Sequence, residues 1–536
     1  MQPVKIIALI VCSLAFGNGL LQAQQKPNIV LILADDMGYS DASRFGSEIE
    51  TPHIDAIADR GVIFKQFYNA GRCCPTRASL LTGQYAHNTG LGFMTGFDQG
   101  TYGYKGEMNQ NCVTIAEALK PAGYTSYLSG KWHVSSNIKP KGDKSNWPLQ
   151  RGFDGYFGIL QGSGSYFDPK TLTSGNKLIH ADKDFYLTDA ISDSATKFID
   201  NQFKTNKPFF LYVAYTAPHW PLHAKAETMN KYLELYEKGW DLLRKQRYKK
   251  QIKIGLADKN TKLSPKDTVP AWSGIPEKDK AMWIKRMAIY AAQIEVMDQG
   301  VGRIVDALQK NNFLDNTILI FLSDNGACAE YISRTVPTIE TIGMAGSFES
   351  YLGYWANLSN TPYRYYKTRT FEGGIKAPFI FSWPGKIKNI GRIIDNQPAH
   401  VIDLLPTLLS ASGASYPSTY HGIPINPLNG QDLNPILTGG RMPERVLYWE
   451  HEGNKAILDN YWKLVSKSSN SRPYEGAWEL YNMTNDKTEL IDLAKKYPTK
   501  VKELSSKWEN WAKANHVYPI LGSDMKTRAQ DYPREH

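Results

Sequence analysis

Short runs of apolar residues recur along the chain, and polar or charged residues follow most of them at once. The clearest runs are 28–33, 124–128, 209–215, 317–322 and 377–383. Continuous apolar runs of this length are typical of strands that are buried on both faces. Stretches with helical spacing of apolar residues separate them, at 51–61, 114–123 and 287–309. This alternation predicts an α/β fold, with a large, mainly parallel sheet sandwiched by helices.

The polar residues that follow the runs are candidates for a single site. In parallel sheets, ligands bind beyond the carboxyl ends of the strands. The side chains that fall at these predicted ends are Asp35 and Asp36, Lys131 and His133, His219, and Asp324 and Asn325. We therefore expect them to converge at one edge of the sheet.

The pattern changes after about residue 430. Short apolar segments at 446–449, 455–458, 462–465 and 478–481 suggest antiparallel strands, and 493–514 has the spacing of an amphipathic helix. We expect a catalytic α/β domain over 24–430 and a smaller C-terminal α+β subdomain, built on a short antiparallel sheet, over 431–536. The charged stretch 225–253 predicts a solvated surface helix.

Residues 1–23 have the pattern of a signal peptide. Lys5 precedes the apolar run 6–16, and a small-residue segment allows cleavage after Ala23. The run is too short to span a bilayer, and no later run reaches that length, so no integral membrane segment is expected. The pattern predicts export to the periplasm or the extracellular space.

The net charge indicates which classes of partner to expect. The chain of 536 residues has 62 Lys and Arg against 52 Asp and Glu, a net charge of +10 that attracts anions. The positive charge is dispersed, without a polybasic tail, so no nucleic-acid partner is expected.

Four cysteines follow the predicted signal peptide: Cys73, Cys74, Cys112 and Cys328. They are too few for a disulfide scaffold, although one bridge is possible.

Two pairs of oxygen-bearing side chains predict a metal site. Asp35-Asp36 and Asp324-Asn325 lie far apart in sequence but in matching positions after predicted strands. Carboxylate and amide oxygens are hard ligands that suit calcium or magnesium. Either pair alone could instead cap a helix.

The segment from Cys73 to Gly83 carries the most specific pattern. Pro75 and Thr76 mark a helix start, which favours anions, and Arg77 adds a fixed cation in the first turn. A buried, inert thiol is the alternative for Cys73. The residues Cys73, Pro75, Arg77, Thr82 and Gly83 match the Cys-x-Pro-x-Arg…Thr-Gly signature, so the chain resembles the formylglycine-dependent (type I) sulfatases. Thr76 stands where many members have Ser.

The resemblance extends over about residues 26–384, with a weaker match over 478–493. It includes Lys131 and His133, His219, and Lys367 five residues before Glu372-Gly373-Gly374. The family belongs to the alkaline-phosphatase-like superfamily of α/β metalloenzymes. The resemblance implies a Ca²⁺ held by Asp35, Asp36, Cys73, Asp324 and Asn325, and catalytic roles for Cys73, Arg77, Lys131, His133, His219 and Lys367. It also implies that a formylglycine-generating or sulfatase-maturing enzyme converts Cys73 to formylglycine.

The implied activity is that of an arylsulfatase-like sulfuric ester hydrolase. It would release inorganic sulfate and an alcohol from a sulfated small molecule or, as charge and predicted export favour, a sulfated carbohydrate. Hydrated formylglycine would attack sulfur, while calcium, Lys131 and Lys367 hold the sulfate oxygens. His219 is the first candidate for protonating the leaving alcohol and Lys367 the second, and His133 would take the proton that lets sulfate depart.

Two alternatives and the choice of sugar stay open at this point. A phosphate or phosphonate ester hydrolase could use the same scaffold. A non-catalytic binder of sulfated glycans could keep Cys73 unmodified. The segments 93–105, 162–177 and 327–364, which are rich in Gly and Tyr and adjoin the motifs, are the predicted specificity surfaces.

Overall fold

The structure is a computed structural model that describes residues 25–205, 207–395, 397–468 and 475–519. The predicted signal peptide, 1–23, lies outside the described residues. Among the helices that the structure describes, none is both long and apolar enough to cross a bilayer.

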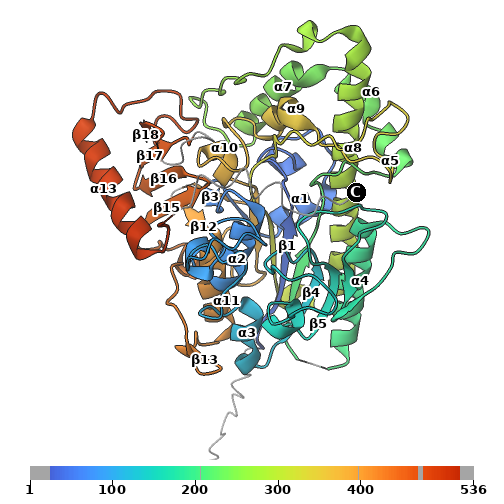
Figure 1. Ribbon diagram of the computed structural model, residues 1–536, viewed down its shortest axis with the longest axis vertical. Helices are drawn as coiled ribbons and strands as arrows, with labels where there is room; N and C mark the ends of the chain where they lie inside the picture. The colour runs from blue at the N-terminus through green and yellow to red at the C-terminus, as the bar shows by residue number, and fades with distance from the viewer. Residues whose placement is uncertain (1–24, 206, 396, 469–474, 520–536) are drawn as a thin grey trace, which may run out of the picture.

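The described residues form an alternating series of strands and helices (Figure 1). The strands are β1 (Asn28–Ala34), β2 (Val62–Phe64), β3 (Phe67–Tyr68), β4 (Thr125–Gly130), β5 (Gly155–Ile159), β6 (Leu172–Ser174), β7 (Lys177–Leu178), β8 (Phe209–Ala214), β9 (Thr317–Ser323), β10 (Phe379–Ser382), β11 (Ile393–Ile394), β12 (Ala399–His400), β13 (Thr419–Tyr420), β14 (Ile423–Pro424), β15 (Val446–His451), β16 (Asn454–Asp459), β17 (Trp462–Ser466) and β18 (Trp478–Asn482). The α-helices are α1 (Pro52–Asp59), α2 (Cys73–Thr82), α3 (Ile115–Leu119), α4 (Leu187–Phe203), α5 (Ala226–Asn230), α6 (Leu233–Tyr236), α7 (Gly239–Lys253), α8 (Glu277–Lys310), α9 (Leu352–Ser359), α10 (Glu372–Ile375), α11 (Leu404–Ser412), α12 (Asn434–Leu437) and α13 (Pro498–Ala514).

The main sheet has the strand order β11-β2-β10-β9-β1-β8-β4-β5-β6-β7. Its four central strands, β9, β1, β8 and β4, pair in parallel, so their carboxyl ends meet at one edge. Antiparallel pairings occur toward the outside, where β10 pairs with β9 and β6 with β5. The predicted fold class, a mainly parallel α/β sheet sandwiched by helices, is confirmed, and the five predicted strands form with ends shifted by one or two residues.

Helices cover both faces of this sheet because alternate side chains of the central strands point to opposite sides. Val30 and Ile32 of β1 belong to a core shared with α1, α4 and α8. Ile29 and Leu31 belong to a second core shared with α2, α3 and α11. Figure 1 shows α4 and α8 on one side of the central strands and α2, α3 and α11 on the other. This double burial explains why the strands read as unbroken apolar runs.

A four-stranded antiparallel sheet, β15-β16-β17-β18, follows the main sheet in sequence and lies beside it with α13 on its outer face (Figure 1). Leu504 and Trp508 of α13 pack against one face of the small sheet. The predicted helix over 493–514 begins later than expected, at Pro498, which occupies the first helical turn. The expected domain boundary at residue 430 stays a prediction.

Buried charges join the small sheet to the main domain. Lys463 Nζ on β17 lies 2.7 Å from Glu372 Oε1 on α10 and 2.7 Å from Glu489 Oε1. All three side chains are completely buried. The small sheet therefore docks in one register, because a shift would leave buried charges without partners.

The expectation of a solvated surface helix over 225–253 is wrong for its longest part. The segment forms α5, α6 and α7, and α7 buries its inner face. Arg247 is buried, with Nη1 2.6 Å from Asp41 Oδ1 and Nη2 2.7 Å from Glu48 Oε1. A charge-rich composition does not reveal that one arginine has buried carboxylate partners more than 190 positions away.

Arg247 also supports the loop that follows β1. Asp41 accepts hydrogen bonds from the backbone N–H of Gly38 and from the hydroxyl of Tyr290. Replacing Arg247 with Met leaves the buried Asp41 and the partly buried Glu48 without their cation. We therefore predict that Arg247→Met lowers the free energy of unfolding by about 3–5 kcal/mol. Urea unfolding followed by tryptophan fluorescence measures this change. Lys245→Met, at an exposed position of the same helix, is the matched control, and equal stability of the two variants would contradict the prediction.

Candidate functional site

The functional side chains lie where the four central strands end. Asp35 and Asp36 follow β1, Asp324 and Asn325 follow β9, and His219 lies in the loop after β8. Lys131 directly follows β4, whose last residue is Gly130. Gly130 has φ +123°, and a Cβ there would lie 1.9 Å from the carbonyl oxygen of Ala214, so only glycine fits between the strands at this point.

Cys73 enters the site from α2, of which it is the first residue. Its side chain is buried, and its sulfur lies within 4.8 Å of the sulfur of Cys74 and of a ring nitrogen of His133. A hydrogen bond from Cys74 holds the pKa of the Cys73 thiol well below its usual range, and Lys131, His133 and Lys367 act in the same direction against the opposing effect of burial. The position therefore favours an anion.

Three buried carboxylates form the centre of the site, and each is paired with a cation. Lys131 Nζ lies 2.6 Å from Asp35 Oδ2, and Arg77 Nη2 lies 2.9 Å from Asp324 Oδ2. The third pair joins Lys367 Nζ to Asp36 Oδ1 at 2.8 Å. The six side chains are at most 2 % exposed.

The three pairs do not neutralise the carboxylates equally. Burial raises the pKa of Asp35, and burial together with the charge of Asp35 raises the pKa of Asp324 well above its usual range. Burial opposes ionisation of Asp36 as well, but Lys367 and His219 keep the pKa of Asp36 below its usual value. The cluster therefore holds more negative charge than its neighbours fully stabilise.

Two oxygen atoms in this cluster lack hydrogen bonds. Asp35 Oδ1 and Asn325 Oδ1 are buried, and neither accepts a hydrogen bond. Asn325 Nδ2 instead donates to Asp36 Oδ1 at 2.7 Å, which ties the two strand ends together. Asp35 Oδ1 has only a longer ion-pair contact, 3.6 Å from Arg77 Nη2. Hard oxygen donors without hydrogen bonds, next to incompletely stabilised carboxylates, fit a divalent cation such as Ca²⁺.

Burial keeps both histidines of the site neutral near pH 7. It lowers the pKa of His133 to about 4 and that of His219 to about 4. His219 Nδ1 lies 2.6 Å from the carbonyl oxygen of Trp220, so Nδ1 carries the proton of the neutral ring. Nε2 then has no proton, and it lies 3.5 Å from Lys367 Nζ and 3.4 Å from Asp36 Oδ2.

Sequence reasoning missed two charged residues that border the site. Glu330 Oε2 lies 3.7 Å from Lys367 Nζ, and Glu330 Oε1 lies 2.9 Å from Arg72 Nη1. Arg72 directly precedes Cys73, and Glu330 lies in the predicted specificity segment 327–364. Their proximity to the motifs is the signal that could have identified them.

The four cysteines that the structure describes, Cys73, Cys74, Cys112 and Cys328, are all free thiols. No bridge forms among them, and Cys328 Sγ instead donates to Glu330 Oε2 at 3.2 Å. The one disulfide that the sequence left open is therefore not formed.

Comparison with known proteins identifies the family. The Sulfatase family model matches residues 27–414. An uncharacterized sulfatase of Schizosaccharomyces pombe is 33% identical over 529 residues, covering 90% of this chain and 93% of its own. An arylsulfatase of Klebsiella aerogenes is 32% identical over 456 residues, covering 81% and 96%.

A solved structure supports the same assignment. The crystal structure of Ps i-CgsB in complex with k-i-k-neocarrahexaose has a TM-score of 0.67 and 27% sequence identity, covering 95% of this chain and 98% of that one. The family-model match ends at residue 414, before the small C-terminal sheet, whereas the alignment with the solved structure covers 95% of this chain. This chain belongs to the sulfatase family and is a sulfuric ester hydrolase.

Proposed function

We propose that this protein hydrolyses sulfate monoesters of a carbohydrate, with formylglycine at position 73 as the nucleophile and Ca²⁺ at the carboxylate cluster. The observation that carries the proposal is the place of Cys73. It lies at the N-terminal end of α2, buried, in a cationic environment and beside His133. A sulfate ester needs such an environment, because an anionic ester repels an anionic nucleophile unless cations neutralise the charge.

Residues around position 73 are suited to hold a sulfate group. The first N–H groups of α2 and the cations Lys131 and Lys367 favour an anion at this position. A hydrated formylglycine would supply two hydroxyls on one carbon, one to attack sulfur and one through which sulfate is later expelled. His133 is neutral, and its Nδ1 forms no hydrogen bond, so the ring is free to accept a proton beside residue 73.

Asp35, Asp36, Asp324 and Asn325, with residue 73, would hold Ca²⁺. The free oxygens Asp35 Oδ1 and Asn325 Oδ1 support this ligand set. Ca²⁺ would polarise a sulfate oxygen and stabilise negative charge as it develops. Arg77 would keep Asp324 in place through their 2.9 Å contact.

The proton for the leaving oxygen would come from His219 and Lys367 acting together. The tautomer of His219 leaves Nε2 without a proton, whereas the charge of Asp36 raises the pKa of Lys367 well above its usual value against the effect of burial. This geometry favours Lys367 as the proton donor and His219 as the group that orients it, which reverses the order of the two candidates.

A carbohydrate substrate agrees with three observations. The chain has a net charge of +10, its first 23 residues have the pattern of an export signal, and a relative of 27% identity was solved with k-i-k-neocarrahexaose bound. A formylglycine-generating or sulfatase-maturing enzyme is the partner that the proposal requires.

The nucleophile can be tested by substitution. Cys73→Ala removes the side chain that is converted, so we predict that release of sulfate from 4-nitrophenyl sulfate falls by at least about 10⁴-fold, as for other nucleophile deletions. Cys112→Ala removes a buried thiol outside the site and serves as the control, with activity close to wild type. Substantial turnover by Cys73→Ala, or preferred release of phosphate from 4-nitrophenyl phosphate by the wild type, would refute the proposal.

The metal can be tested by removal and by an isosteric change. Asp324→Asn keeps the shape of the side chain and removes its charge, so we predict at least about tenfold weaker Ca²⁺ binding, measured by calorimetry on chelator-treated protein. Asp315→Asn, at an exposed position, controls for loss of a carboxylate. A chelator-treated wild type that neither binds Ca²⁺ nor loses activity would exclude the calcium assignment.

The proton donor can be tested with a series of sulfate esters whose leaving alcohols differ in pKa. We predict that Lys367→Ala loses about 10²–10⁴-fold on alkyl sulfates and less on 4-nitrophenyl sulfate, whose leaving group needs little protonation. His219→Ala should show a smaller dependence on the leaving group, because Lys367 remains. If kcat of Lys367→Ala falls by the same factor for every ester, Lys367 does not supply the proton.

A further inference from the structure

A row of charged side chains leads from the catalytic centre toward the surface. Beyond Lys367 it consists of Glu330, Arg72 and Glu452, which we name the mouth row. Arg72 Nη1 lies 2.9 Å from Glu330 Oε1 and 4.0 Å from Glu452 Oε1. The three side chains are 27%, 14% and 28% exposed, so the row is reached by solvent along its length.

The mouth row combines three distant segments. Glu330 comes from the loop after β9, Arg72 from the residue before α2, and Glu452 from the turn between β15 and β16. The small C-terminal sheet therefore contributes Glu452 to the row. Burial would raise the pKa of Glu330, but Arg72 and Lys367 hold it below its usual range, so Glu330 is an anion.

Aromatic side chains border the mouth row on one side. Trp220 directly follows His219, and its indole N–H donates to Glu330 Oε2 at 3.2 Å. The ring of Trp220 lies 5.6 Å from that of Phe348, and the guanidinium of Arg334 lies 4.4 Å above Phe348. Trp220 thus connects the acid–base pair to the row.

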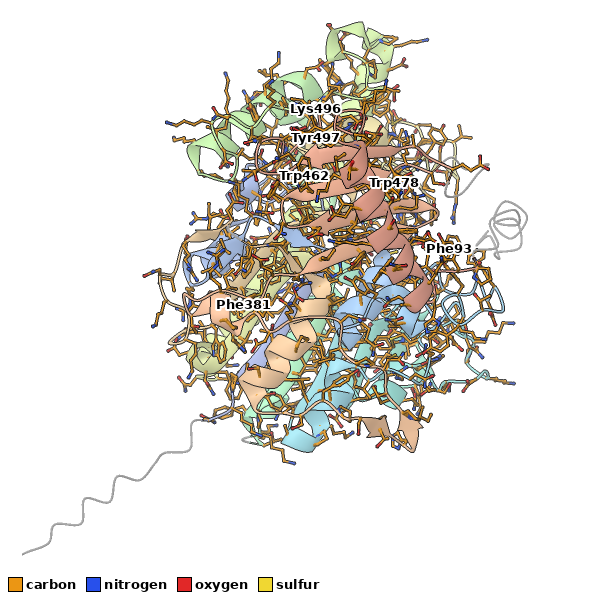
Figure 2. All side chains as sticks on the ribbon, turned by 90° about the vertical axis from the view of Figure 1, so that its left-hand side faces the viewer. Phe93, Phe381, Trp462, Trp478, Lys496 and Tyr497 are labelled. Atoms are coloured by element: carbon orange, nitrogen blue, oxygen red, sulfur yellow. The ribbon has the colours of Figure 1, made fainter. Side chains whose placement is uncertain are left out.

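A second aromatic contact borders the row where the C-terminal sheet approaches. Phe93 stacks on His451, with ring centroids 6.0 Å apart, and His451 directly precedes Glu452. Figure 2 shows Phe93 beside the end of this sheet. Near the nucleophile, the backbone at Gly162 lies close to the ring of His133, because a Cβ at Gly162 would lie 2.4 Å from His133 Nε2.

The steps of sulfate transfer use none of Glu330, Arg72, Glu452 and Trp220, yet all four are partly exposed and form a chain of contacts that begins at Lys367. Carboxylates accept hydrogen bonds from sugar hydroxyls, a guanidinium donates to sugar oxygens, and an aromatic face packs against the C–H face of a pyranose. A plain aryl group has no hydroxyls with which to form such hydrogen bonds.

We propose that the mouth row and Trp220 form a leaving-group subsite that takes a neutral, monosulfated hexose unit. This inference rests on the proposed sulfatase function. The mouth row itself has two carboxylates and the one guanidinium of Arg72, and Arg334, which lies over Phe348 beside the row, balances the second carboxylate. The subsite therefore has no excess positive charge to attract a second anion. A second sulfate on the same sugar would instead meet Glu330 or Glu452, and like-charge contact is a means of rejecting the wrong ligand.

The test compares hexose monosulfates, sulfated at each hydroxyl in turn, with 4-nitrophenyl sulfate. For the best hexose monosulfate, we expect Glu330→Gln and Glu452→Gln each to lower the ratio of its kcat/KM to that of 4-nitrophenyl sulfate by about 10- to 100-fold, mainly through KM, as for lost hydrogen bonds to charged groups. Glu340→Gln, an exposed position in the same loop, should leave the ratio within about twofold, in line with a surface substitution away from the site. Equal conversion of residue 73, checked by peptide mass, ensures that the variants are compared as mature enzymes.

A charge-specific measurement separates a binding role from a structural one. On a disulfated form of the same hexose, Glu330→Gln should raise kcat/KM relative to the monosulfated form, because the variant removes a repelling charge; a structural defect would lower both alike. Unchanged ratios in both variants, or turnover of 4-nitrophenyl sulfate with none of any hexose monosulfate, would overturn the subsite while leaving the sulfatase assignment intact. Failure of the wild type to release sulfate from any ester would overturn both.

Discussion

The site depends on the burial of three carboxylates at the carboxyl edge of one sheet. Asp35, Asp36 and Asp324 are within reach of one another because β1 and β9 are parallel neighbours that end together. Burying these three carboxylates without cations beside them would cost a large free energy. Arg77, Lys131 and Lys367 each compensate one of them, and the oxygens that remain free favour a divalent cation. The surrounding residues keep these six charges in place.

Much of the remaining structure can be understood as support for that cluster. Arg247 fixes Asp41 in the loop that carries Asp35 and Asp36, and Gly130 lets β4 end close enough to β8 for Lys131 to enter. The buried Lys463 with Glu372 and Glu489 holds the small sheet against the main domain. That contact has a functional consequence, because the same sheet brings Glu452 to the opening of the site. The small C-terminal sheet, which looks separate from the catalytic domain in the sequence, thus contributes to the surface that is proposed to bind the substrate.

The sequence predicted the fold, and the proximity of the candidate side chains, for the same reason. Strands buried on both faces read as unbroken apolar runs, and their ends are where an α/β sheet binds ligands, so Asp35, Lys131, His219 and Asp324 stood out. Arg247 did not, because a charged helix looks the same whether its arginine contacts water or a buried Asp41. Glu330 and Arg72 adjoin the motifs in sequence, but the approach of Glu452 to Arg72 could not be predicted, because it depends on how a second sheet is placed, which no local pattern records. The preference for Lys367 over His219 as proton donor likewise came from a contact, that of His219 Nδ1 with the carbonyl of Trp220.

The residues proposed to select the substrate lie beside those proposed to carry out the reaction but are not the same residues. In the proposed function, cations and carboxylates deep in the site bind the sulfate, and in the proposed subsite the mouth row binds the alcohol that leaves. Both assignments assume that residue 73 is converted, since a cysteine has no second hydroxyl through which to expel sulfate. The most direct measurement is the mass of the tryptic peptide from Cys73 to Arg77 in protein isolated from its native source. The account predicts formylglycine at position 73, and an unmodified cysteine in that peptide would contradict it.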